Sequence, residues 1–135
     1  MSDHRVVLDS YALLAYFEAE KGATRVQETL RDAEAGKVSL LMSTVNWCEV
    51  YYSIWRAKGE QAAEQCALVM DQLPIALVDI DRQLAHIAAR FKANYPIALG
   101  DCLAAALATA RDANVLTGDP EFKKLEREVP VEWIE

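Results

Sequence analysis

Short apolar runs alternate along the chain with longer segments in which apolar residues recur at helical spacing. Apolar runs of this length with polar ends are typical of strands that are covered on both faces. Strands are predicted over residues 5–9, 38–42, 75–79, 114–117 and 131–134. Because helical patterns separate these strands, we expect an α/β fold with a parallel sheet.

The segments between the strands carry apolar residues three and four positions apart, which predicts helices with one buried face. In the segment after Asp81, for example, we expect Leu84, Ile87, Ala88 and Phe91 to point inward. Helices are predicted over 10–19, 23–35, 60–72 and 101–113, from Ser43 or Thr44 to near Gly59, from Asp81 onward and from Pro120 onward.

Length and composition narrow the class of protein. The chain has 135 residues, of which 53% are hydrophobic, and this length predicts a single domain over residues 1–135. No apolar run reaches the ~20 residues that a membrane span needs, and the first residues do not resemble a signal peptide. We therefore expect a soluble cytoplasmic protein without a membrane partner. Three cysteines without a C-x-x-C motif indicate neither a disulfide framework nor a zinc site.

Two acidic residues stand where predicted strands end. Asp9 closes the first strand, and Asp119 follows the fourth. Ligand sites in open parallel sheets form beyond the carboxyl ends of the strands. Both acids are also favoured helix N-caps, and Pro120 is a favoured first helical residue. Position alone leaves a site role and a capping role open for Asp9, and a cap is enough to explain Asp119.

Two further acids lie within or beside predicted helices. Glu49 stands among apolar neighbours, and no basic residue is three or four positions away from it. A buried ionised carboxylate needs a cation, which favours a metal-ligand role over a partly exposed position at the helix edge. Asp101 follows Gly100 at the predicted start of an Ala-rich helix, where an N-cap is the simpler explanation for this residue alone.

The four acids indicate more as a set, because their positions allow them to converge on one crevice. Crowded carboxylates raise one another's pKa unless a cation offsets their charge. Mg²⁺ and Mn²⁺ prefer such hard oxygen ligands. Ions of this kind activate a water and stabilise the leaving oxygen during in-line displacement at phosphorus. The residues predicted to form a Mg²⁺ or Mn²⁺ site are Asp9, Glu49, Asp101 and Asp119.

Four segments carry a family resemblance. V-V-L-D-S, N-W-C-E-V, G-D-C-L-A-A-A-L-A and T-G-D-P-E-F resemble, in this order, the four acidic motifs of the PIN-domain nucleases. The chain length and the motif order resemble the VapC toxins of bacterial and archaeal toxin–antitoxin pairs, over nearly the whole chain. The resemblance matches the same four acids to the metal site. It also matches Ser10 and Thr117 to hydroxyl residues that support the first and last acids.

The resemblance implies a PIN-like three-layer fold with a five-stranded, mostly parallel sheet flanked by helices. It implies a metal-dependent endoribonuclease that acts as the toxin of a type II toxin–antitoxin pair, with RNA as its substrate. It further implies a homodimer and a cognate antitoxin whose tail blocks the acidic groove. The alternative within the same fold is a catalytically silent module that binds RNA or a protein partner.

The formal net charge of −7, taken alone, argues against a nucleic-acid partner. If the four site acids are ionised, about −3 remains outside the expected metal pocket. Two groups of cations are candidates for an RNA-binding patch. They are Arg56 with Lys58, and Lys123 with Lys124 and Arg127.

Two other Mg²⁺-binding folds also place acids at strand ends, and the sequence disfavours both. A receiver domain needs paired acids after its first strand, where this chain has Ser10 and Tyr11 after Asp9. It also needs a lysine after its last strand, and this chain ends there with Trp133, Ile134 and Glu135. A phosphatase of the haloacid dehalogenase type needs an aspartate at the position of Tyr11.

Overall fold

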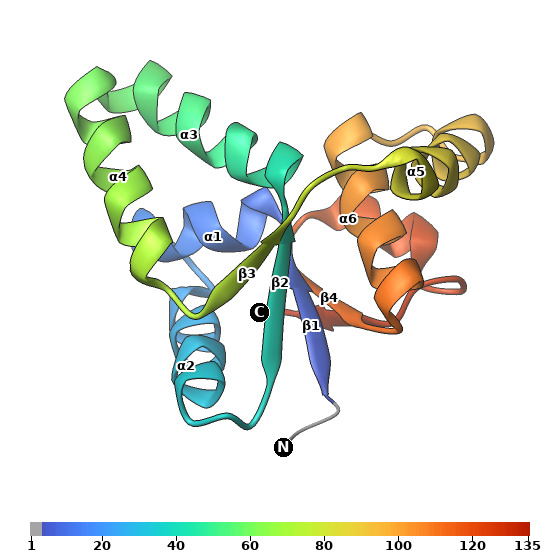
Figure 1. The fold of residues 1–135 in the computed structure, drawn as a ribbon, viewed down its shortest axis with the longest axis horizontal. Coiled ribbons are helices and arrows are strands. Elements are labelled where there is room, and N and C mark those ends of the chain that lie inside the picture. Colours follow the sequence, from blue (N-terminus) through green and yellow to red (C-terminus); the bar gives the residue numbers. More distant parts are fainter. Residues whose placement is uncertain (1–3) are drawn as a thin grey trace.

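The computed structural model describes residues 4–135, and a five-stranded sheet forms its centre (Figure 1). The strand order is β3-β2-β1-β4-β5, and every neighbouring pair is parallel. The predicted α/β fold with a five-stranded sheet is confirmed. The strands are β1 (Arg5–Leu8), β2 (Ser39–Ser43), β3 (Ile75–Val78), β4 (Asn114–Thr117) and β5 (Val131–Trp133).

Helices cover both faces of this sheet. Figure 1 shows α1 to α4 on one side and α5 with α6 on the other. The helices are α1 (Ser10–Phe17), α2 (Ala23–Glu34), α3 (Thr44–Lys58), α4 (Glu60–Gln72), α5 (Arg82–Asn94), α6 (Leu99–Arg111) and the 3₁₀ helix η1 (Pro120–Leu125). No helix in residues 4–135 is both long and apolar enough to cross a membrane.

Alternate residues of each strand enter different hydrophobic cores, because successive side chains of a strand point to opposite faces. Val7 and Val115 pack into the core beneath α5, α6 and η1. Val6 and Leu8 pack into the core beneath α1 to α4. Since both of their faces are covered, β1, β2 and β4 are apolar between their polar ends, as the sequence pattern indicated.

Short polar side chains begin three of the helices. Asp9, Ser43 and Asp81 are the N-caps of α1, α3 and α5, and each accepts a hydrogen bond from the backbone N–H three residues later. These bonds satisfy donors that lack a partner within the helix. The structure thus selects Ser43 rather than Thr44 as the cap of α3.

The predicted ranges of two helices, α1 and α6, were wrong by two residues. Helix α6 begins at Leu99 with Ala98 as its N-cap, so Asp101 lies in the first turn and does not start the helix. The capping explanation for Asp101 therefore fails, and the Asp101 carboxylate is not used as a cap. Helix α1 ends at Phe17 and not at Ala19, because Ala19 has a left-handed φ of 52°.

The strand order creates a switch point at β1. The chain passes from β1 to β2 on one side, and later returns to place β4 on the other side of β1. Leu8 pairs with Leu116, so Asp9, directly after β1, lies beside Thr117, the last residue of β4. Crevices at such points are where open parallel sheets bind ligands.

Candidate functional site

Asp9 lies at the carboxyl end of β1 and is only 1% exposed. Its Oδ1 accepts a hydrogen bond from the backbone N–H of Ala12 at 2.9 Å. Its Oδ2 accepts one from Thr117 Oγ1 at 2.5 Å. The two roles left open for Asp9 are therefore compatible, because one oxygen caps α1 while the other faces the end of β4.

Thr117 connects Asp9 to Asp119. The same Thr117 hydroxyl that donates to Asp9 accepts a hydrogen bond from the backbone N–H of Asp119 at 2.9 Å. Asp119 also caps η1, since its Oδ1 accepts from the backbone N–H of Glu121 at 3.0 Å. Thr117 is 0% exposed, so this link lies in the interior.

Glu49 reaches the same region from α3. Its Oε1 accepts hydrogen bonds from Ser10 Oγ at 3.0 Å and from Asn46 Nδ2 at 2.9 Å. The expectation that a half-buried Glu49 needs a cation was therefore incomplete, because two neutral donors already satisfy one carboxylate oxygen. The Ser10 hydroxyl donates its hydrogen bond to Glu49, whereas the family resemblance had matched Ser10 to a residue that supports Asp9.

Asn46 is a site residue that the sequence analysis missed. It is 1% exposed, and its amide also donates to the backbone carbonyl of Gly100 at 3.2 Å. Its Oδ1 accepts from Ser43 Oγ at 2.8 Å. The signal in the sequence is an amide side chain three residues before Glu49, on the same helix face.

Gly100 allows Glu49 and α6 to approach closely. A Cβ added at Gly100 would lie 2.3 Å from Glu49 Oε2 and 2.5 Å from Glu49 Oε1. Only a glycine leaves room for this carboxylate against the backbone. Gly100 thus allows the Glu49 carboxylate to take its position against α6. No local sequence pattern indicated this contact between two helices.

The electrostatics of the site join the four predicted acids. The pKa of Asp9 is raised to about 7, mainly by burial. The negative charges of Asp101 and Asp119 add to the rise, while the hydrogen bonds from Thr117 and Ala12 lower the pKa. Burial is also the main reason that the pKa of Asp101 rises to about 7. The negative charges of Asp119, Glu49 and Glu121 add to this rise.

These interactions place Asp9, Glu49, Asp101 and Asp119 around one end of the sheet. Glu121, two residues after Asp119, joins them through its effect on Asp101 and was not predicted. The charges that raise the pKa of Asp9 and of Asp101 all belong to carboxylates. The arrangement is electrostatically unfavourable without a cation.

The donor set has the chemistry that a hard divalent cation requires, since it consists of carboxylate oxygens that share a negative environment. Among residues 4–135, however, no three His, Cys, Asp or Glu side chains are grouped as a metal-binding cluster. The residues fit such an ion by donor type and by charge. Asp119, Glu49 and Glu121 lie close enough to Asp101 for their charges to raise its pKa.

The PIN domain family model matches residues 6–128. The chain therefore belongs to the PIN domain family. A comparison with curated protein sequences found no match.

Solved structures share the fold of this PIN domain at low sequence identity. VapBC2 from Rickettsia felis bound to a promoter DNA fragment has a TM-score of 0.72 at 17% identity, covering 96% of this chain and 98% of that one. DNA-bound VapBC from Salmonella typhimurium gives 0.72 at 16%, covering 98% and 99%. The Mycobacterium tuberculosis toxin VapC20, which cleaves the sarcin–ricin loop, gives 0.69 at 13%, covering 89% and 94%.

Proposed function

We propose that this PIN domain is a metal-dependent endoribonuclease and the toxin of a type II toxin–antitoxin pair. The observation that carries the proposal is the gathering of acids from four separate segments, with two carboxyl pKa values raised to about 7. Such an arrangement lowers the stability of the metal-free fold, so a function best accounts for it. The residues proposed to hold Mg²⁺ or Mn²⁺ are Asp9, Glu49, Asp101 and Asp119.

The chain's own residues orient these acids. Thr117 and the Ala12 N–H hold the two oxygens of Asp9, while Ser10 and Asn46 hold Glu49. Hydrogen bonds of this kind direct the remaining lone pairs of a carboxylate toward a ligand. When bound, a divalent ion supplies charge neutralisation at the phosphate and a lower pKa for the attacking water.

The proposal includes two protein partners. The fold likeness to VapBC complexes supports a cognate antitoxin, and that antitoxin would block the acidic crevice. A second copy of this chain is the other partner. Exposed apolar side chains, among them Leu77 and Leu99, supply surface for such contacts. Light scattering of the purified protein measures whether it is a dimer.

A cleavage experiment tests the enzymatic part of the proposal. The wild-type protein and Asp9→Asn are incubated with cellular RNA in Mg²⁺, in Mn²⁺ or in EDTA, and the new RNA ends are sequenced. Asn keeps the cap on α1 but removes the charge. We expect specific ends only for the wild type with a divalent ion, and a loss of at least about 100-fold for Asp9→Asn.

The outcomes separate the two candidate functions. RNA binding without cleavage in either metal would identify the silent binding module. Equal cleavage by wild type and Asp9→Asn would rule out the proposed metal site. Growth arrest on induction of the wild type, and not of Asp9→Asn, would support the role as a toxin.

A further inference from the structure

The outward face of α3 extends from the candidate site to the end of the helix. Glu49, Tyr52 and Arg56 are spaced by three and four residues, so they lie on one side of the helix in successive turns. Val50 and Ile54 occupy the opposite side and are buried. At 1.5 Å per residue, Arg56 lies about 10 Å along the helix axis from Glu49.

Tyr52 and Arg56 make a cation–π contact on this face. The guanidinium carbon of Arg56 lies 5.0 Å from the centroid of the Tyr52 ring. Tyr52 remains 41% exposed, and its neighbour Trp55 is 43% exposed. The cation–π contact restricts the Arg56 side chain. Arg56 therefore loses less conformational entropy when a ligand binds to it.

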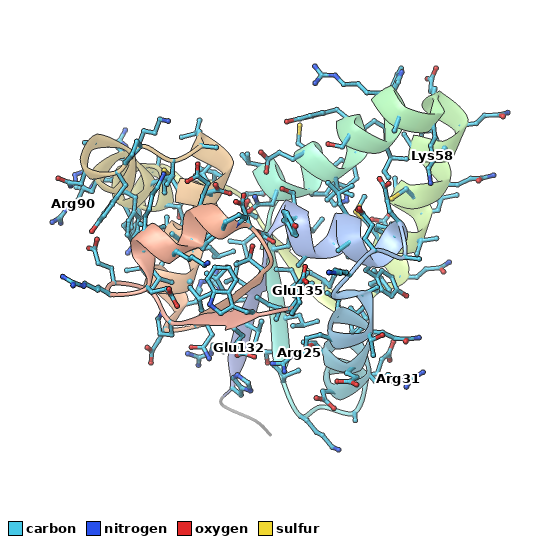
Figure 2. All side chains as sticks on the ribbon, turned by 180° about the vertical axis from the view of Figure 1, so that it is seen from behind. Arg25, Arg31, Lys58, Arg90, Glu132 and Glu135 are labelled. Carbon is cyan, nitrogen blue, oxygen red and sulfur yellow. The ribbon has the colours of Figure 1, made fainter. Side chains whose placement is uncertain are left out.

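The last turn of α3 carries two cations, Arg56 on this face and Lys58 on the side away from it. Figure 2 shows Lys58 at the far end of α3, on the opposite side of the molecule from Arg90. None of the ion pairs in residues 4–135 includes Arg56 or Lys58. Lys124, from the other predicted cation group, is instead paired with Glu121 at 2.6 Å. Attraction to the helix dipole explains cations in the last turn of α3, but not the exposed aromatic rings beside them.

We infer that the Tyr52–Arg56 pair binds an unpaired RNA base next to the candidate cleavage site. This inference rests on the proposed endoribonuclease function. Unstacked bases stack on aromatic rings and on guanidinium planes, and the guanidinium N–H groups of Arg56 can donate hydrogen bonds to a backbone phosphate. A duplex hides its bases within the stack, so the surface selects single-stranded RNA or a loop.

Binding and kinetics test the inference together. The anisotropy of a fluorescein-labelled, unstructured RNA oligonucleotide gives Kd in EDTA, and cleavage of the same RNA in Mg²⁺ gives KM and kcat. We expect Tyr52→Ala to raise Kd and KM by about five- to 100-fold with little change in kcat, because stacking contributes affinity. Tyr52→Phe keeps the ring and should stay within about twofold.

Arg56→Ala should weaken binding and reduce the slope of log Kd against log salt by about 0.7, the value for one phosphate contact on a single strand. Arg90→Ala is the matched control, because it removes an exposed helical arginine from the other side of the molecule. A blunt, fully paired RNA duplex exposes no base for stacking, so it should bind the wild type and Tyr52→Ala alike. Tyr52→Leu keeps apolar bulk without a π face, and it replaces Tyr52→Ala if the latter lowers Tm.

Three results have distinct meanings. If the wild type cleaves RNA while Tyr52→Ala, Tyr52→Leu and Arg56→Ala keep its Kd and KM, the inference is overturned and the proposed function stands; this face then serves a protein partner. If Arg90→Ala weakens binding equally, the effect is bulk charge and the inference also fails. If the variants lose RNA binding but the wild type cleaves in neither metal, the proposed function fails and the RNA platform stands.

Discussion

Thr117 Oγ1 donates a hydrogen bond to Asp9 Oδ2 at 2.5 Å, across 108 residues of sequence. The parallel pairing of β1 and β4 brings the two residues together where both strands end. The same hydroxyl accepts a hydrogen bond from the Asp119 backbone, so one buried side chain fixes the position of two acids. Replacing Thr117 should therefore change the positions of both Asp9 and Asp119.

Thr117→Val removes this hydroxyl while keeping the shape of the side chain. We expect a loss of about 1–3 kcal/mol in the free energy of unfolding, because the Asp119 N–H and Asp9 each lose a partner. RNA cleavage should fall by at least about tenfold. Denaturant unfolding and cleavage rates measure the two effects. Thr117→Ser restores the hydroxyl, and a Ser variant as impaired as Val would show that the hydrogen bonds are not what matters.

Gly100→Ala should separate activity from stability. The added Cβ would lie 2.3 Å from Glu49 Oε2, and this carboxylate is the flexible end of a side chain that can move away. Ala also favours the helix by up to about 1 kcal/mol over Gly. We expect Tm to be unchanged or slightly higher, and cleavage to fall by about tenfold or more as Glu49 leaves its partners.

The control for Gly100 uses Glu49 itself. In a Glu49→Ala background, the clash is absent, so adding Gly100→Ala should cause no further loss of activity and should raise Tm by the helix-propensity effect alone. Additive losses in the double variant would contradict the proposed contact between Glu49 and Gly100.

Asn46→Asp should disturb the site more than an equal change elsewhere. The new carboxylate would face Glu49 Oε1 and the Gly100 carbonyl, both of which now accept hydrogen bonds from the Asn46 amide. We expect a destabilisation of about 2–4 kcal/mol and a large loss of cleavage. Thermal unfolding and cleavage rates check this expectation.

Asn114→Asp is the matched control for Asn46→Asp. Asn114 also donates an amide hydrogen bond to a carboxylate, that of Glu132, but Glu132 bonds to His4 and Arg25 rather than to any site acid. The Asn114 variant should lose stability and keep its kcat. If both variants lose activity in proportion to stability, Asn46 has only a structural role.

The pH dependence of stability follows from Asp9 and Asp101. Their folded-state pKa of about 7 lies above the ordinary value of 3.8. Between these values, the unfolded chain releases protons that the folded protein keeps, so the free energy of unfolding falls as the pH rises from about 4 to about 7. Calorimetry in EDTA should show Tm falling by several degrees across this range.

Two additions test the origin of that pH effect. Asp9→Asn removes one of the raised carboxyls, so its Tm should exceed that of the wild type by a margin that grows toward pH 7. Mg²⁺ or Mn²⁺ binds the ionised carboxylates, so stabilisation by the ion should increase with pH over the same range. A metal-induced shift in Tm that is independent of pH would exclude these two acids as ligands.

The sequence by itself determined the order of strands and helices along the chain and most of their bounds to within two residues, and it predicted the four acids. These features depend on residues within a few positions of one another. Apolar periodicity marks the buried face of each element, and small polar residues such as Asp9, Ser43 and Asp81 mark helix starts. The order of the acidic motifs was sufficient for the family resemblance that the family model confirms.

Only the tertiary structure decided which side chains support the acids. The contacts from Asn46 and Ser10 to Glu49, and from Gly100 to the Glu49 carboxylate, join segments that have no common local pattern. The raised pKa values have the same origin, since burial and charge proximity arise only when separate elements pack together. Local periodicity can indicate which face of an element is buried, but not which distant side chain it will meet there.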